Sequence, residues 1–171
     1  MSWSLLARLR VPLGFICAAL AFWLARPSRS SILAGLGIAI VGEAVRVWAS
    51  GHIDKGVEIT RSGPYRLVRH PLYLGSTLMG LGFMVAAASP LVAAIVAAYL
   101  GVTLAAAMRT EEAVLDRRFD GQYSAYREGR AVPSDRPFSF ARVVRNREHR
   151  ALAGFLLGWG ILYWRWWMGT G

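Results

Sequence analysis

Five apolar segments constrain the fold of this chain more than any other feature. They cover about residues 11–25, 31–50, 71–88, 90–108 and 151–168. About 20 apolar residues in a helix cross the hydrocarbon core of a bilayer, and only a helix bonds all its backbone groups within one such segment. Hydrophobic residues make up 55% of the chain and charged residues only 18%. The sequence therefore predicts an all-α, polytopic membrane protein, a single domain over residues 1–171 with about five transmembrane helices.

The first segment also has the features of a signal-peptide core, since it is short and follows Arg8 and Arg10. The bulky residues 22–24 stand where small residues would precede a cleavage site. We therefore expect this segment to be retained as a span.

The basic residues predict which side of the membrane carries the polar segments. The formal net charge is +10, and most arginines lie between residues 51 and 70 or after Met108. The positive-inside rule places these stretches and the N-terminus on the cytoplasmic side of a membrane, the bacterial inner membrane being the expected one. Nucleic acid is not an expected partner, because basic residues that interrupt apolar runs fit an anionic membrane surface better.

Residues 131–150 form the one long stretch of low hydropathy. Its prolines and phenylalanines predict an irregular piece on the membrane surface, and its arginines predict contacts with lipid phosphates. A solvated connector is the alternative interpretation.

A tight helical hairpin is predicted where Ser89-Pro90 separates the third and fourth apolar segments, because proline favours the first turn of a helix. The two outer ends of this hairpin then lie at the same membrane face. The run Gly-Pro-Tyr-Arg-Leu-Val-Arg-His-Pro-Leu-Tyr-Leu-Gly, residues 63–75, enters the hairpin, and Glu111-Glu112 follow it. The polar residues of both stretches are therefore expected to lie at one level.

These residue types are complementary to a zwitterion. With Pro71 at the first helical position, Arg69 and His70 precede a helix N-terminus, whose free amide groups bind anions. Glu111 and Glu112 offer carboxylates to a cation. The amino acid end of S-adenosylmethionine is such a group. In the alternative interpretation, the arginines bind lipid phosphates and the glutamates pair with arginines along a helix.

Together with Glu111-Glu112 and the downstream aromatic residues, residues 63–75 resemble the isoprenylcysteine carboxyl methyltransferase family of integral membrane enzymes. The resemblance covers about residues 46–137. It implies a helical membrane enzyme that transfers a methyl group from S-adenosylmethionine to the carboxylate of a lipophilic acceptor entering from the bilayer. The positions that it assigns to the cofactor are Tyr65, His70, Pro71, Leu72, Tyr73 and one of Glu111 and Glu112.

The resemblance also points to a stretch before this signature, Val57, Glu58, Ile59 and Thr60. The family normally opens this stretch with histidine, so only main-chain contacts are expected at Val57. Arg69 joins the candidate set through the anion site, and Gly75 because a glycine permits close approach by another backbone or a flat ligand.

The acceptor is expected to meet an arginine. Arg46 lies inside the second apolar segment, where an arginine is costly and faces a partner such as Glu43 or a cavity. Arg109 is the second candidate, although the family's substrate-facing arginine lies about one helical turn before the paired acids. A carboxylate needs only a cation to orient it, whereas an amine must lose a proton, to His52 or His70. The sequence contains no HExxH motif or Cys/His cluster, so a metal is not implied.

Other functions remain open at this stage. They are a phospholipid amine methyltransferase, an NADPH-dependent enzyme similar to sterol reductases, and a non-catalytic membrane protein. The expected partners are a lipophilic acceptor and membrane lipids. Gly35, Gly37 and Gly42 fit close helix packing within or between chains.

Overall fold

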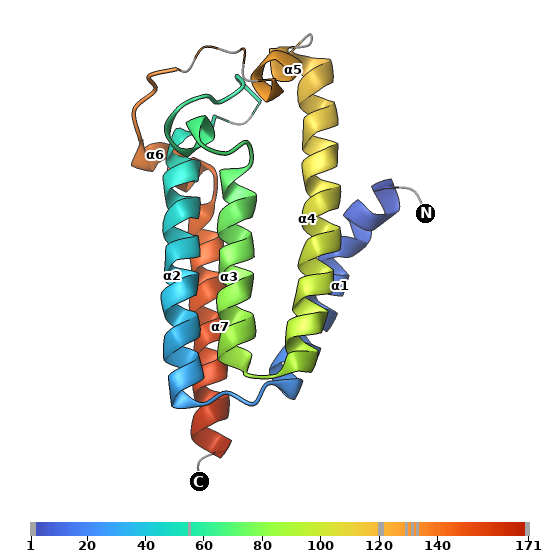
Figure 1. The fold of residues 1–171 in the computed structure, drawn as a ribbon, viewed down its shortest axis with the longest axis vertical. Helices are drawn as coiled ribbons and strands as arrows, with labels where there is room; N and C mark the ends of the chain where they lie inside the picture. Colours follow the sequence, from blue (N-terminus) through green and yellow to red (C-terminus); the bar gives the residue numbers. More distant parts are fainter. Residues whose placement is uncertain are drawn as a thin grey trace.

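The computed structural model describes residues 3–54, 56–119, 122–128, 130, 132 and 134–169. Helices dominate these residues, and no strand occurs among them, so the predicted all-α class is confirmed (Figure 1). The helices are α1 (Trp3–Leu24), α2 (Arg29–His52), α3 (Pro71–Ala87), α4 (Pro90–Arg118), α5 (Gln122–Arg127), α6 (Phe140–Arg145) and α7 (Glu148–Gly169), with the 3-10 helix η1 (Gly63–Arg66).

Each predicted apolar segment coincides with one of the long helices α1, α2, α3, α4 and α7, and two of the segments, 11–25 and 71–88, extend one residue beyond the helix end. By length and composition, α2 and α4 can cross a membrane. The apolar parts of α1 and α3, Pro12–Leu24 and Pro71–Ala87, are shorter. Membrane crossing is therefore supported for two helices, and the count of five spans stays a prediction.

The helices form two groups that diverge toward one end of the bundle. α2 packs along α3 and against α7, while α1 packs against α4 (Figure 1). The end at which the groups diverge carries η1, α5 and α6, and we call it the polar end. Among the described residues, it comprises 52–54, 56–71, 109–119, 122–127 and 134–148.

Glycines bring α2 and α3 close together. A Cβ added at Gly42 would lie 2.7 Å from the Gly75 carbonyl oxygen, and one added at Gly82 would lie 2.5 Å from the Gly35 carbonyl oxygen. Only glycine permits two helix backbones to approach this closely. Gly35 and Gly42 thus serve packing within the chain, whereas a Cβ at Gly37 would meet no atom of the described residues within 4 Å.

The predicted hairpin between α3 and α4 is confirmed. Ala88 adopts a left-handed backbone conformation (φ 47°), and the Ser89 side chain accepts a hydrogen bond from the Val92 amide, with Pro90 in the first turn of α4. Ala86, Ala87 and Val92 are fully buried here. The hairpin therefore closes the bundle opposite the polar end.

Contacts across the closed end hold the two groups of helices together. The Arg26 amide donates to the Ala87 carbonyl oxygen at 2.8 Å. The Arg165 side chain of α7 donates to the carbonyl oxygens of Trp23, in the last turn of α1, and Ala25, just after it. These bonds satisfy carbonyl groups that a helix end leaves without intrahelical partners.

The segment that leads into α7 is partly helical and bonds to the protein. Residues 131 and 133 lie outside the described residues, 134–139 are irregular as predicted, and 140–145 form α6. Arg136 and Arg145 pair with Asp54 at 3.2 and 2.8 Å, and Arg142 donates to the Gly51 carbonyl oxygen at 2.7 Å. These three arginines fasten the segment to the C-terminal end of α2, and the contacts of this segment with lipid phosphates stay a prediction.

Candidate active site

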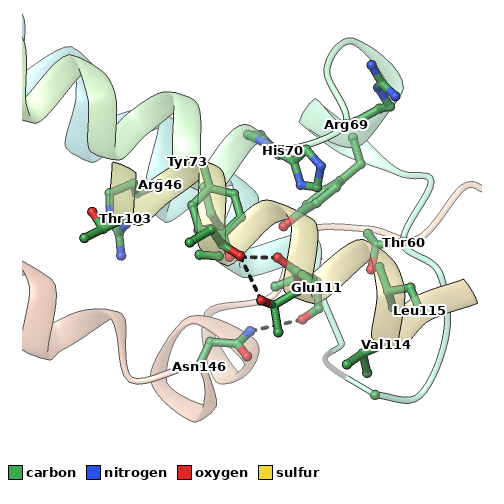
Figure 2. Close-up of a pocket in the computed structure, with 18 of the residues that line it drawn as sticks. Arg46, Thr60, Arg69, His70, Tyr73, Thr103, Glu111, Val114, Leu115 and Asn146 are labelled. Carbon is green, nitrogen blue, oxygen red and sulfur yellow. Dashed lines mark hydrogen bonds between the residues drawn. The ribbon is translucent and has the colours of Figure 1, made fainter. Parts of the chain in front are cut away.

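One large cavity, of about 1070 Å³, runs from the polar end into the apolar part of the bundle. Its polar wall includes Tyr65, Tyr73, Glu111, Asn146 and Glu148. Figure 2 shows labelled residues of this pocket, with side chains from α2, α3, α4 and the loops at the polar end. Its apolar wall includes Leu13, Cys17, Ile95, Ala98, Val102 and Ala106. A single cavity thus offers polar contacts at one end and an apolar slot at the other.

The N-terminus of α3 lies at the polar end of this cavity, as the signature predicts. His70 is the N-cap and Pro71 occupies the first turn, but the His70 side chain does not cap the helix. Its Nε2 lies 2.9 Å from Glu112 Oε1 of α4 instead. The two parts of the motif, 42 residues apart, therefore meet at one level, which confirms the prediction drawn from the hairpin.

The paired glutamates have different surroundings. Glu111 lines the cavity and accepts a hydrogen bond from the Tyr73 hydroxyl at 2.9 Å (Figure 2). Glu112 does not line it, and accepts a bond from the Tyr123 hydroxyl at 3.0 Å in addition to its contact with His70. Glu111 is thus the carboxylate available to a ligand, and Glu112 joins α3, α4 and α5.

Two buried hydroxyl groups of the cavity wall have no hydrogen-bond partner among the described residues. They belong to Tyr65 and Thr60, which are 7% and 6% exposed. Burial raises the pKa of Tyr65, so the hydroxyl stays protonated and can donate. The Tyr126 hydroxyl donates to the Tyr65 carbonyl oxygen at 2.7 Å and fixes this segment. A buried hydroxyl without a partner costs about 1–3 kcal/mol, which a polar ligand would recover.

Arg46 reaches the cavity from α2. Its Nε donates to Glu148 Oε1 at 2.7 Å and its Nη1 to Ser76 Oγ at 2.5 Å, whereas Glu43, the partner considered from the sequence, lies 4.0 Å from Nε. Sequence reasoning missed Glu148, which is 102 residues away. The one sequence signal that could have found Glu148 is its position as an acidic residue shortly before the last apolar segment, 151–168.

Most of the other predicted cofactor residues lie on the cavity wall, and two of them, Val57 and Gly75, do not. The residues on the wall are Glu58, Ile59, Arg69, His70, Pro71 and Leu72. Val57 borders a separate small hollow, and its side chain is exposed. Gly75 faces α2, where an added Cβ would lie 2.5 Å from Arg46 Cγ. Gly75 therefore permits the approach of a backbone, the first of the two roles predicted for it.

His52 and Arg109, the other candidates for a role at the acceptor, also lie off the cavity wall. His52 is buried, with its Nδ1 3.1 Å from Ser62 Oγ and its ring against Gly63. Arg109 is exposed on α4. Sequence reasoning could place both residues near the polar end but could not give the direction of their side chains.

The fold and the site define a class: a helical membrane protein with an ionisable site at one end of an apolar cavity. Residues 9–122 match the family model described as phospholipid methyltransferase, and the chain belongs to this family. It is the family of membrane methyltransferases similar to isoprenylcysteine carboxyl methyltransferase, so the resemblance seen in the sequence is confirmed. Its members are methyltransferases that typically use S-adenosylmethionine.

Two curated relatives share part of the chain. The nickel-cobalt-cadmium resistance protein NccN of Alcaligenes xylosoxydans xylosoxydans is 32% identical over 101 residues, which are 57% of this chain and 45% of that protein. The cobalt-zinc-cadmium resistance protein CzcN of Cupriavidus metallidurans is 32% identical over 120 residues, 64% of this chain and 54% of that protein. The matched part of the chain thus spans about half the length of each relative. No solved structure matches the chain.

Proposed function

We propose that this protein transfers a methyl group from S-adenosylmethionine to a lipophilic acceptor that enters from the membrane. The observation that carries the proposal is the continuous cavity, which joins Glu111 and the buried Tyr65 and Thr60 hydroxyls to an apolar slot. Its volume, about 1070 Å³, lies just above the range of about 300–1,000 Å³ for small-molecule sites. The cavity can thus accept two reactants in contact.

The polar end fits the amino acid part of S-adenosylmethionine. Glu111 would bind its ammonium group, and Arg69 with the first amide groups of α3 would bind its carboxylate. The orphaned hydroxyls of Tyr65 and Thr60 supply further donors. The cofactor, when bound, supplies an electrophilic methyl group on a sulfonium sulfur. The residues that we assign to it are Glu58, Ile59, Thr60, Tyr65, Arg69, His70, Pro71, Leu72, Tyr73 and Glu111.

The chain contributes alignment and exclusion of water, which an in-line methyl transfer requires. The Tyr73 hydroxyl orients the Glu111 carboxylate toward the cavity. His70, Glu112 and Tyr123 hold the ends of α3, α4 and α5 at fixed separation. The apolar slot keeps water from the acceptor chain. No residue has to form a covalent intermediate.

A carboxylate is the proposed methyl acceptor, and Arg46 orients it. Arg46 lines the cavity, and a carboxylate is already ionised at neutral pH, so no base is needed. A phospholipid amine is the second candidate, favoured by the description of the family and by the two carboxylates, Glu43 and Glu148, beside Arg46. An amine must lose a proton, which His70 could accept from the cavity wall.

The proposed topology follows from the same site. All five long helices cross the membrane, and the polar end, rich in arginine, lies in the cytoplasm together with the N-terminus. For a bacterial protein, the membrane is the inner one. A water-soluble cofactor then reaches Glu111 from the cytoplasm, and the acceptor reaches the slot from the bilayer.

The decisive experiment compares ligands and then follows the methyl group. Purified protein in detergent is titrated with S-adenosylmethionine and, separately, NADPH, while its unfolding temperature is measured. Only S-adenosylmethionine should stabilise it. Stabilisation by NADPH alone would indicate a reductase, and none by either ligand would indicate a non-catalytic protein. Incubation with methyl-labelled cofactor and a total lipid and protein extract then identifies the acceptor: label released by mild base indicates an ester, and base-stable label on a phospholipid an amine.

Tyr65→Phe should separate cofactor binding from stability. The Tyr65 hydroxyl has no partner in the described residues, so its removal should leave the unfolding temperature of the free protein unchanged or raise it. Affinity for S-adenosylmethionine should fall about threefold to tenfold, the effect of one hydrogen bond. Calorimetric titration and thermal unfolding measure the two quantities.

Tyr126→Phe is the matched control, because its hydroxyl does have a partner, the Tyr65 carbonyl oxygen. This variant should lose about 1 kcal/mol of stability in the absence of the cofactor. If Tyr65→Phe binds S-adenosylmethionine as tightly as the wild type, the hydroxyl does not contact the cofactor.

A further inference from the structure

We propose that Glu148, at the start of α7, is a positioning residue that holds Arg46 toward an anionic oxygen of the acceptor headgroup. The proposal rests on the proposed function and concerns a part of the chain, residues 134–169, that lies outside the family match over residues 9–122. In this protein, the C-terminal helix thus contributes to acceptor binding as well as to the bundle.

The Arg46 side chain is fixed along its whole length. Gly75 of α3 leaves room for its stem, since a Cβ there would lie 2.5 Å from Arg46 Cγ. The Ser76 hydroxyl accepts from Nη1 and donates to the Leu72 carbonyl oxygen at 3.0 Å, so its orientation is set from both sides. Glu148 holds Nε at 2.7 Å. Among the described residues, Nη2 has no hydrogen-bond partner, so its two N–H groups are left for a ligand.

Hydrogen bonds from Asn146 to the C-terminal end of α2 position Glu148 beside Arg46. Asn146 Nδ2 donates to the carbonyl oxygens of Ser50 and Ile53, at 2.9 and 3.0 Å. Arg147 then adopts a left-handed backbone conformation (φ 59°), unusual for a residue other than glycine, and α7 begins at Glu148. Because Ser50 lies one turn beyond Arg46 in α2, the corner between α6 and α7 places Glu148 beside Arg46.

The charge of Arg46 requires such a partner. Its side chain is 20% exposed and that of Glu148 only 6%, so both charges are largely removed from water. A guanidinium at membrane depth is stabilised by a nearby carboxylate or extends toward water. With Glu148 removed, the Arg46 guanidinium would lose the bond that sets its direction, and Glu43, 4.0 Å from Nε, would be its remaining acidic neighbour. The pairing with Glu148 therefore determines the direction in which the Arg46 guanidinium points.

Two kinds of acceptor present the same chemistry to Arg46. One is a carboxylate, the group that receives the methyl; the other is the phosphate beside the amine of a phospholipid. Both are anionic oxygens that accept hydrogen bonds from a guanidinium. The experiment must therefore use one probe of each kind.

The test compares Glu148→Ala, Glu148→Gln and the control Glu128→Ala, which removes a glutamate from an exposed pair with Arg130. Methyl transfer is measured at saturating labelled cofactor against increasing palmitate or phosphatidylethanolamine in mixed micelles, and against total lipid extract. Glu148→Ala should raise the KM for the labelled acceptor at least tenfold with a much smaller change in kcat. Glu148→Gln should lie between it and the wild type, since an amide oxygen still accepts from Nε. Glu128→Ala should match the wild type, and the Kd for S-adenosylmethionine should stay within twofold throughout.

The outcomes separate this proposal from the proposed function. If the wild type labels an acceptor and Glu148→Ala has an unchanged KM, the positioning role is wrong and the proposed function stands. If Glu148→Ala and Glu148→Gln both lose affinity for the cofactor, the role of Glu148 is structural. If the wild type binds S-adenosylmethionine but labels no lipid, the lipophilic acceptor is wrong, and with it both proposals. The probe that gains label identifies the anionic oxygen.

Discussion

Glu111→Gln is expected to lower the affinity for S-adenosylmethionine about 10- to 100-fold. Glu111 is the carboxylate of the motif that lines the cavity, and Tyr73 holds it there. The amide keeps the shape and the hydrogen bond from Tyr73 but loses the charge that would bind an ammonium group. A hydrogen bond to a charged group contributes about 1.5–3 kcal/mol, which corresponds to this range. Isothermal titration calorimetry in detergent measures it.

Glu112→Gln is the matched control, one residue away on the same helix. Its contacts are His70 and Tyr123, so its loss should reduce the free energy of unfolding by about 1 kcal/mol. Its affinity for S-adenosylmethionine should change less than threefold, and the double variant should resemble Glu111→Gln. If Glu112→Gln lowers the affinity for S-adenosylmethionine more than Glu111→Gln does, the roles of the two glutamates are exchanged. If the double variant binds S-adenosylmethionine with unchanged affinity, the assignment of the cofactor site is wrong.

Gly35→Ala is expected to cause the largest loss of stability among the glycine variants of α2. The added Cβ would lie 2.3 Å from the Gly82 carbonyl oxygen and 2.8 Å from the Ala86 amide nitrogen, so a backbone must move. Such overpacking costs about 1–3 kcal/mol. Because α2 carries Arg46 and α3 carries Tyr73, the shift should also reduce methyl transfer. Thermal unfolding in detergent and the transfer assay measure these effects.

Gly37→Ala is its control, two residues along the same helix. A Cβ at this position meets no described atom within 4 Å, and alanine favours helix over glycine by up to about 1 kcal/mol. The variant should be as stable as the wild type or more so. Equal stability of the two alanine variants would mean that the close approach of α2 and α3 does not limit stability.

The sequence predicted those features that depend on local patterns. Long apolar runs located the helices, and prolines at positions 71 and 90 located the starts of α3 and α4 within a residue. The hairpin then required His70 and the glutamates to lie at one level, which the contact between His70 and Glu112 confirms. Each of these inferences needs only neighbouring residues and helix geometry.

The features that escaped prediction depend on side-chain direction and on distant packing. Consecutive residues in a helix point about 100° apart, so the sequence could not tell that Glu111 faces the cavity and Glu112 faces His70 and Tyr123. His52 follows the second apolar run at the expected level, yet its ring turns toward Ser62 and Gly63. The pairing of Arg46 with Glu148 requires α7 to fold back onto α2, and no local pattern encodes that contact.

The cavity ends short of the hairpin that closes the bundle, because no described residue between Tyr73 and Ile95 lines it. Val92 is fully buried beside the hairpin, and Ile95, one turn further, is the first residue of α4 to line the cavity. From Ile95 to Glu111, α4 rises about 24 Å, more than the roughly 15 Å of hydrocarbon in one leaflet. We therefore expect the depth of the slot to limit the length of the acceptor's apolar chain. Under the proposed function, an acceptor chain longer than the slot would bend out into the bilayer, and a shorter one would leave its headgroup below the methyl donor.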